Sequence, residues 1–202
     1  VVYSEMISVT GLFHHSPKTR RLFNFTSQEQ SLIIQIFGTV PEHFAYAARY
    51  ITEQVKPAGI DINFGCPVRD IIKTGAGCYL MKNLSLAKEI LSAVRENTDL
   101  PVSIKTRTQV GDVTVLDLLA AVKDVSLQAL MIHGRSFTQK FSGTINMELI
   151  KEAKKVFTGV VLANGNLNSP EQVKEILDQT GCDGVGLARG VLGRPYLFTQ
   201  VK

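Results

Sequence analysis

Side chains capable of acid–base chemistry and ligand binding recur at the ends of short apolar runs along the chain. Each run is rich in β-branched residues, as a buried strand is, and ends on an amide, a thiol, an imidazole or a cation. In chain order these residues are Gln35, Asn63, Cys66, Lys105, Arg107, His133, Arg135, Asn164 and Arg189. Any one of them is readily explained as a cap or a buried core group, whereas six strand ends in succession indicate one shared site.

Cys66 stands out because Pro67 follows it directly and ends the strand there. That position predicts a thiol at the mouth of the site. A free thiol ordinarily has a pKa of about 8.5, so at neutral pH it is mostly protonated unless a cation lowers that pKa. Such a group can serve as a proton donor as readily as a nucleophile. The other two cysteines, Cys78 and Cys182, fit small buried apolar positions.

The last two strand ends carry glycines next to polar side chains, in Asn164-Gly165 and in Arg189-Gly190. Glycine lets backbone N–H groups approach a ligand closely, and a guanidinium group matches phosphate oxygens with its forked donors. Many α/β barrels bind a phosphate after their final two strands. The pattern therefore favours a phosphate-bearing cofactor or substrate, with ordinary turn glycines as the alternative.

The elements that must position these residues alternate between short strands and amphipathic helices. Helical periodicity covers Pro41–Val55 and Leu84–Glu96, and Asn168-Ser169-Pro170-Glu171 is typical of a helix start. Strands are predicted at Val1–Ser8, Leu32–Gly38, Ile60–Gly65, Val102–Arg107, Ala129–Arg135, Val160–Asn166 and Gly184–Gly190. This alternation predicts an α/β fold with one domain over residues 1–202, a (β/α)8 TIM barrel. Seven strands instead of eight predict an incomplete barrel that lacks its first strand.

Composition excludes several classes of protein. Of the 202 residues, 45% are hydrophobic, which excludes a disordered chain. There is no apolar run of about 18 residues and no signal-peptide pattern, so we expect no membrane association. Three cysteines without metal-ligand spacing predict a reducing, cytoplasmic location and no metal site. The formal net charge of +4 mildly favours an anionic partner.

Taken together, these segments resemble the bacterial-type tRNA-dihydrouridine synthases, FMN-dependent barrel enzymes that reduce uridine in tRNA to 5,6-dihydrouridine. The resemblance is carried, in order, by IDINFGCP, KTGAGCYLM, VSIKTR, MIHGRS, VLANGN and VGLARGVLGRP. The block from Asp61 to Met81 is its most specific part. The resemblance implies an FMN flavoprotein with NADPH as the reductant and tRNA as the partner.

The resemblance also implies a role for each candidate residue. Cys66 is expected to be the general acid that protonates C5 of the uracil while hydride passes from FMN to C6. Lys105 suits the electron-rich N1/O2 edge of the reduced flavin. The residues implied against the isoalloxazine ring and ribityl chain are Gln35, Asn63, Lys105 and His133, and those implied at the FMN phosphate are Asn164, Gly165, Arg189 and Gly190. The cations implied at the flavin or the substrate are Arg107 and Arg135. Arg69 and Lys73 belong to an excess of cations at the mouth of the barrel that suits a phosphodiester ligand such as RNA, with a solvated rim as the alternative.

Members of that family usually begin with a strand that carries Pro-Met-x-Gly and continue past the barrel into a small helical domain. Neither segment is recognisable here, so we expect a barrel domain truncated at both ends. Two alternative hypotheses stand beside the main one. The first is an FMN barrel that acts on a free pyrimidine, as the dihydroorotate dehydrogenases do. The second is an inactive barrel fragment, because a missing strand leaves two sheet edges unpaired.

Overall fold

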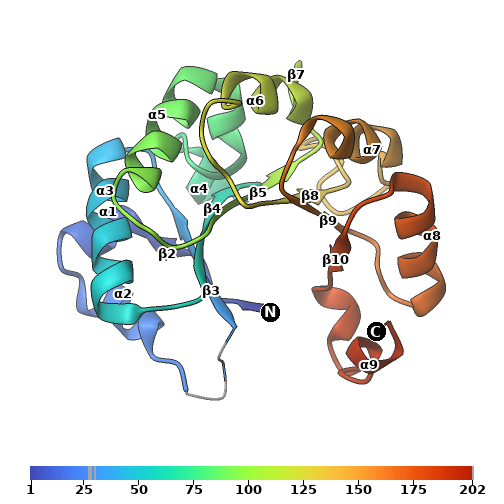
Figure 1. The fold of residues 1–202 in the computed structure, drawn as a ribbon, viewed down its shortest axis with the longest axis horizontal. Helices are drawn as coiled ribbons and strands as arrows, with labels where there is room; N and C mark the ends of the chain where they lie inside the picture. Colours follow the sequence, from blue (N-terminus) through green and yellow to red (C-terminus); the bar gives the residue numbers. More distant parts are fainter. Residues whose placement is uncertain (27–28, 30, 202) are drawn as a thin grey trace.

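The computed structural model describes residues 1–26, 29 and 31–201 of the chain. Its central feature is a curled parallel sheet with helices along its outer side (Figure 1). The strands are β1 (Val2–Tyr3), β2 (Ile7–Ser8), β3 (Leu32–Phe37), β4 (Gly59–Phe64), β5 (Val102–Arg107), β8 (Ala129–His133), β9 (Val160–Asn164) and β10 (Gly184–Gly186). Their order is β1-β3-β4-β5-β8-β9-β10, with β2 also paired to β3, so they occupy seven positions. The predicted incomplete barrel is confirmed.

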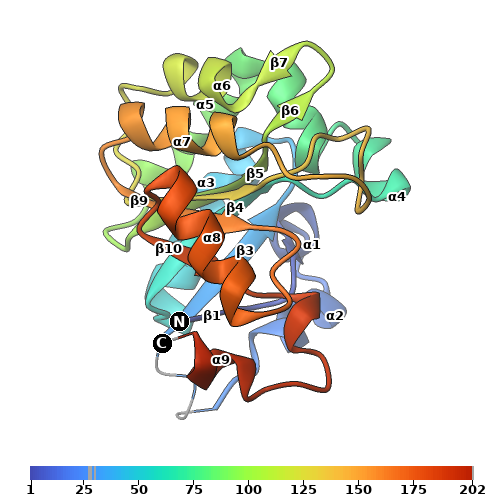
Figure 2. The same cartoon turned by 90° about the vertical axis from the view of Figure 1, so that its right-hand side faces the viewer.

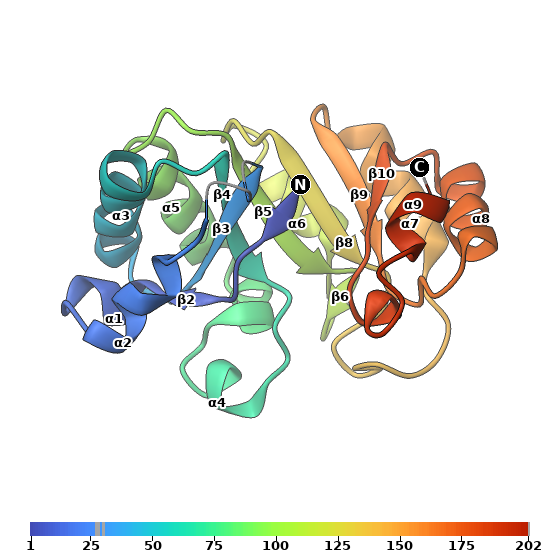
Figure 3. The ribbon, with the colours of Figure 1, turned by 90° about the horizontal axis from the view of Figure 1, so that it is seen from below.

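The sheet curls as a barrel does, but within the described residues it does not close. β1 pairs with β3 at one edge and β10 pairs with β9 at the other, and no described strand joins these two edges. Figure 3 shows the two edges on either side of the opening. The inner side of the sheet is therefore a concave wall on which side chains from different strands converge.

Three helices agree with the sequence prediction. α3 (Pro41–Tyr50) continues into a π-helical turn (Ile51–Val55), and α5 (Leu84–Arg95) ends one residue earlier than predicted. α8 (Pro170–Thr180) begins after Ser169, whose hydroxyl accepts a hydrogen bond from the N–H of Gln172. Helices that the periodicity did not predict are α1 (Val9–Phe13), α2 (Pro17–Arg20), α4 (Arg69–Ile72), α6 (Val115–Ala121), α7 (Met147–Val156) and α9 (Leu197–Gln200). Shorter elements are the 3₁₀ turns Arg21–Phe23, Gly77–Lys82 and Arg189–Val191 and the hairpin of β6 (Gln109–Val110) and β7 (Val113–Thr114).

The predicted strand Val1–Ser8 is in fact broken by a bulge, and this part of the prediction was wrong. Three residues, Ser4 to Met6, stand opposite two residues of β3. The Ser4 N–H donates to Ile33 O (3.0 Å), and its hydroxyl accepts from the N–H of Gln35 (2.9 Å). The extra residue leaves Met6 on the inner side of the sheet, where it lines the cavity described below.

The predicted strand Gly184–Gly190 is also shorter than expected. Pairing with β9 ends at Gly186, and the chain then turns into the short 3₁₀ turn that carries Arg189 and Gly190. The shortening matters for function because it frees these two residues from the sheet and lets their backbone face the cavity.

The apolar core lies between the outer side of the sheet and the helices. β4 is buried along its whole length, with Ile60, Ile62 and Phe64 fully inaccessible. Its two polar residues, Asp61 and Asn63, alternate with them and therefore face the inner side. Among the helices of the described residues, none has the length and apolar character that crossing a membrane requires.

Candidate active site

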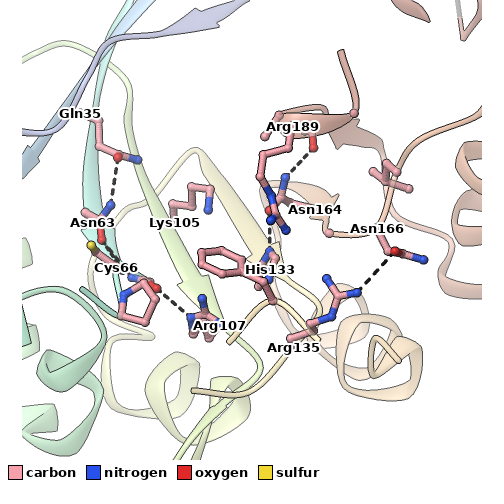
Figure 4. A pocket seen from close by; sticks show the side chains of 18 of the residues that line it. Gln35, Asn63, Cys66, Lys105, Arg107, His133, Arg135, Asn164, Asn166 and Arg189 are labelled. Atoms are coloured by element: carbon pink, nitrogen blue, oxygen red, sulfur yellow. Dashed lines mark hydrogen bonds between the residues drawn. The ribbon is translucent and has the colours of Figure 1, made fainter. Parts of the chain in front are cut away.

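The carboxyl ends of the strands surround a cavity of about 660 Å³ on the inner side of the sheet (Figure 4). Strand ends of a parallel α/β barrel meet at this side, as the sequence analysis expected. Most of the predicted site residues line the cavity, namely Gln35, Asn63, Cys66, Lys105, Arg107, His133, Arg135, Asn164, Gly165, Arg189 and Gly190. The structure thus brings together side chains that lie up to 155 positions apart in the sequence, from Gln35 to Gly190.

Arg69 and Lys73 do not line the cavity. Arg69 begins α4 and Lys73 directly follows its last residue; this helix projects beyond the carboxyl ends of the strands (Figure 2), and both side chains are exposed. Lys73 Nζ is 3.8 Å from Asp70 Oδ1, a weak surface ion pair. These two cations therefore lie outside the cavity, on the exposed surface beside it.

One wall of the cavity holds a chain of hydrogen bonds that starts beneath its surface at Asp61. Gln35 Nε2 donates to Asp61 Oδ2 (2.7 Å), and Asn63 Nδ2 donates to Gln35 Oε1 (2.9 Å). The other carboxylate oxygen, Oδ1, accepts from the Ser103 hydroxyl (2.6 Å). Asn63 Nδ2 also lies 3.0 Å from the sulfur of Met6. Two amide side chains are thereby held in fixed orientations at the cavity wall.

The Cys66 thiol stands at the end of this chain, on a loop whose backbone is held from two sides. Asn63 Oδ1 accepts from the N–H groups of Gly65 (3.1 Å) and Cys66 (2.7 Å). Arg107 Nε donates to Gly65 O (2.8 Å), and the Cys78 N–H donates to Cys66 O (3.1 Å). Cys66 is partly accessible, whereas Cys78 is buried, and burial raises the pKa of the Cys78 thiol to about 11. Of the two, Cys66 is the thiol available to a ligand.

Cations dominate the cavity wall. Lys105, Arg107, Arg135 and Arg189 line it, and among the described lining residues there is no Asp or Glu. Burial lowers the pKa of the Lys105 ammonium, and the charge of Asp61 beneath it partly offsets that effect. No three His, Cys, Asp or Glu side chains of the described residues gather as metal ligands. The cavity is built for a ligand that carries negative charge.

His133 lines the cavity and carries a buried hydrogen-bond acceptor that has no partner among the described residues. Asn164 Nδ2 donates to Gly186 O (2.6 Å), so Asn164 Oδ1 is left to accept the proton of His133 Nδ1 (2.7 Å). Burial lowers the pKa of His133 to about 4, so the ring is neutral at physiological pH and Nε2 carries a lone pair. Nε2 is buried without a partner among the described residues. A ligand N–H or O–H would satisfy it.

The far corner of the cavity is shaped by glycines and an arginine. Gly165 has a φ of +114°, a conformation that favours glycine. A Cβ at Gly190 would overlap the backbone carbonyl oxygen of Leu167, so only glycine fits there. The Arg189 guanidinium lies 4.4 Å from the centre of the Phe141 ring, which holds it at the cavity. Backbone N–H groups that a ligand can approach closely, together with a guanidinium group, are the features that bind a phosphate.

Several residues of the site were missed by the sequence analysis. Asp61 had a detectable signal, because a carboxylate inside an apolar strand, two residues before Asn63, has to lie on the same side of the sheet. Ser103 has the same relation to Lys105. Phe141 gave no signal, since it reaches the cavity from a loop whose path depends on the fold.

Replacing Asp61 with asparagine should stabilise the protein at neutral pH. Burial raises the pKa of this carboxyl from 3.8 to about 6, although hydrogen bonds from Ser103 and Gln35 and the charge of Lys105 act against the rise. A raised native pKa favours folding below about pH 4, and this contribution is lost as the pH rises through about 6. Above that pH the buried charge costs about 3 kcal/mol, at about 1.36 kcal/mol per pKa unit.

The measurement is the free energy of unfolding in urea at about pH 4 and about pH 7.5, for the parent and the Asp61→Asn variant. The stability lost between these pH values should be smaller in the variant by up to about 3 kcal/mol. His133 titrates in both proteins, so its contribution cancels in the comparison. Equal pH dependence of the two proteins would contradict the assigned burial of a charged Asp61.

Comparison with known proteins gives this cavity a context. The sequence profile of the family described as Dihydrouridine synthase (Dus) matches residues 1–202. The chain belongs to the dihydrouridine synthase family. The probable tRNA-dihydrouridine synthase of Treponema pallidum is 34% identical to it over 211 residues, which cover 99% of this chain and 62% of that protein. The predicted family resemblance is confirmed.

Other curated members of the family align in the same way. Probable tRNA-dihydrouridine synthase 1 of Synechocystis is 33% identical across 100% of this chain and 57% of its own length. tRNA-dihydrouridine synthase B of Shewanella oneidensis is 34% identical across 98% of this chain and 62% of its own length. The chain therefore spans about three-fifths of the length of these relatives.

Solved structures support the fold of this family member. A variant of NCR from Zymomonas mobilis superposes with a TM-score of 0.67 at 14% identity, over 99% of this chain and 76% of that one. A tryptophan synthase chain from Pyrococcus furiosus gives a TM-score of 0.57 at 13% identity, over 94% of this chain and 69% of that one. At such low identities these likenesses concern the architecture alone.

Proposed function

We propose that the full-length gene product containing this chain reduces uridine in tRNA to 5,6-dihydrouridine, with FMN as its cofactor and NADPH as its reductant. The observation that carries the proposal is the position of Cys66. Its partly accessible thiol lies at one wall of a cationic cavity, on a loop whose backbone is hydrogen-bonded by both Asn63 and Arg107. The corner at Arg189 and Gly190, which suits a phosphate, lies across the cavity. The chain is also a member of the dihydrouridine synthase family.

The residues of the cavity fit FMN. The volume of the cavity lies within the range of cofactor sites, about 300 to 1,000 Å³. The unpartnered acceptor at His133 Nε2 suits an N–H or O–H of the flavin, and the corner at Arg189 suits a phosphate. We assign the ring and ribityl chain to Gln35, Asn63, Lys105 and His133 and the phosphate to Asn164, Gly165, Arg189 and Gly190.

The protein's own part in the reaction is to place a proton and to stabilise charge. When bound, FMN supplies the hydride that adds to C6 of the uracil. Addition at C6 builds negative charge at C5 and O4 of the base, and Cys66 Sγ holds the proton that C5 takes up. Lys105 and Arg107 place positive charge at the same cavity, where it stabilises the negative charge that develops on the base.

The size of the cavity also implies how tRNA would bind. A uracil that reacts inside it has to leave the base stack, so an unpaired or loop nucleotide is the form that fits. The adjoining phosphates then remain outside, along the exposed cations at the two ends of α4. We assign Arg69 and Lys73 to these phosphates and Arg135 to the cavity side of the substrate.

The decisive experiment incubates the full-length gene product with unmodified tRNA, FMN and NADPH. We expect a gain of two hydrogen atoms per modified uridine, detected by mass spectrometry of the tRNA nucleosides. A polyanion such as heparin should compete with tRNA, and free uracil or orotate should not be turned over. Turnover of a free pyrimidine that heparin does not inhibit would instead establish the small-molecule alternative.

A further inference from the structure

Asp61 is a buried carboxylate that the mechanism above does not use. It is 0% exposed, lies in the middle of β4 and does not line the cavity. Both of its oxygens accept hydrogen bonds, Oδ2 from Gln35 and Oδ1 from Ser103. Because burying a carboxylate opposes folding at neutral pH, a site that keeps one inside an apolar strand needs a reason in function.

In the chain of hydrogen bonds from Asp61 to the Cys66 loop, the groups at the two ends determine which side of each amide donates and which side accepts. A carboxylate can only accept, so Gln35 has to turn its NH₂ group toward Asp61 and its Oε1 toward Asn63. Asn63 then donates with Nδ2 and offers Oδ1 to the loop. The backbone N–H groups of Gly65 and Cys66 can only donate, and both do so to that oxygen. Every amide along the chain is thus fixed in one of its two orientations.

Loss of this direction would act on the loop that carries the thiol. If Asn63 turned over, its NH₂ group would face two backbone N–H groups, and both would lose their acceptor. The carbonyl side of the loop would still be held by Arg107 and by the N–H of Cys78. The loop would therefore stay attached but would be free to shift on the side that presents the Cys66 thiol.

We propose that Asp61 is a positioning residue for the reaction: its carboxylate fixes the direction of the Gln35–Asn63 amide chain and so holds the Cys66 thiol in place at the cavity. The inference rests on the proposed role of Cys66 as proton donor. Asp61 does not line the cavity, so it acts only through its neighbours. The groups that face it are Tyr3 of β1, Gln35 of β3 and Ser103 and Lys105 of β5.

Two substitutions at this position separate positioning from other effects. Asp61→Leu removes the acceptor while it keeps the branched skeleton of the side chain, and it should lower kcat by about 10- to 100-fold, with KM for tRNA within about twofold. Asp61→Asn can still accept from Gln35 through Oδ1 while its NH₂ group faces the Ser103 hydroxyl, so it should keep kcat within about fivefold of the parent. Ser103→Ala is the matched control, because it removes a hydrogen bond to the same carboxylate but leaves the amide chain intact.

A second readout needs neither flavin nor tRNA. In the flavin-free protein, the rate of Cys66 alkylation by iodoacetamide reports how the loop presents the thiol, and peptide mass spectrometry resolves it from Cys78 and Cys182. These two are buried, at 0% and 7% exposure, and serve as internal references for intact folding. Asp61→Leu should change the Cys66 rate by about fivefold or more, while Asp61→Asn and Ser103→Ala leave it within about twofold.

The two readouts have separate outcomes. If the parent makes no dihydrouridine, the proposed function fails, and the alkylation rates still decide whether Asp61 positions the loop. If Asp61→Leu is folded by thermal melting yet matches the parent in both kcat and alkylation rate, the inference is overturned. Should that variant not fold, Gln35→Met removes the next link of the same chain, because its side chain has a similar length but carries neither the N–H donor nor the amide oxygen. It should reproduce the altered Cys66 alkylation rate, and an unchanged rate there would equally overturn the inference.

Discussion

Cys66→Ala should lower dihydrouridine formation by the full-length protein by about 10²- to 10⁴-fold, the usual contribution of a general acid, while FMN remains bound. Alanine keeps the backbone groups through which Asn63, Arg107 and Cys78 hold the loop, so the variant removes the thiol without removing its support. Turnover is measured as dihydrouridine per tRNA under single-turnover conditions, and flavin content by absorbance of the purified protein.

Cys78→Ala is the matched control for this prediction. Cys78 lies in the neighbouring turn, but it is fully buried, and burial raises the pKa of its thiol to about 11. Its replacement should leave turnover within a few-fold of the parent, apart from any loss of stability. An active Cys66→Ala variant would refute the assignment of the proton to this thiol, and inactivity of both variants would indicate a packing effect instead.

The site was predictable from the sequence wherever it depends on strand direction. Parallel strands end at one side, so a polar residue at the end of each apolar run has to converge on the others. From the sequence alone, this reasoning predicts that Gln35, Lys105, His133 and Arg189 meet at one site, and all four line the cavity. It works because the register of a parallel sheet is set by the same alternation of residues that the sequence displays.

What escaped prediction depends on pairing between distant segments. Met6 enters the cavity because of a bulge, which becomes visible only when β1 and β2 are aligned with β3. The partners of Asp61 come from the neighbouring strands, so its hydrogen bonds cannot be read from IDINFG alone.

α7 escaped prediction for a different reason. Its Asn146 cap and its buried residues Ile150 and Ala153 are ordinary helix signals that the sequence does display.

The exposed cations Arg69 and Lys73 show the limit of the strand-end argument. They follow the third predicted strand closely in sequence, but the chain leaves the sheet after Phe64 and forms α4 before it returns. Their distance from the cavity follows from this excursion. A role for them therefore has to be argued from a ligand larger than FMN, and in the proposed function that ligand is the RNA.

Gly190→Ala should weaken FMN binding by about 100-fold or more. The new Cβ would overlap the backbone carbonyl oxygen of Leu167, so the turn that carries Arg189 and Gly190 would have to move away from the loop after β9. Overpacking of this kind costs about 1–3 kcal/mol by itself. A displaced turn also withdraws backbone donors and the guanidinium from the phosphate, for which an ångström of error is already costly. FMN affinity is measured by quenching of flavin fluorescence.

Gly193→Ala provides the matched control for the effect of a methyl group in this segment. Gly193 has a φ of +71°, so alanine there is strained, but its Cβ would meet no atom within 4 Å. We expect a modest loss of stability, about 1 kcal/mol, with FMN affinity within about threefold of the parent. The phosphate assignment also requires that riboflavin, which lacks the phosphate, bind the parent and Gly190→Ala with similar affinity. If Gly190→Ala weakened the binding of riboflavin as much as that of FMN, the defect would lie at the isoalloxazine ring, and the phosphate would have to be placed elsewhere.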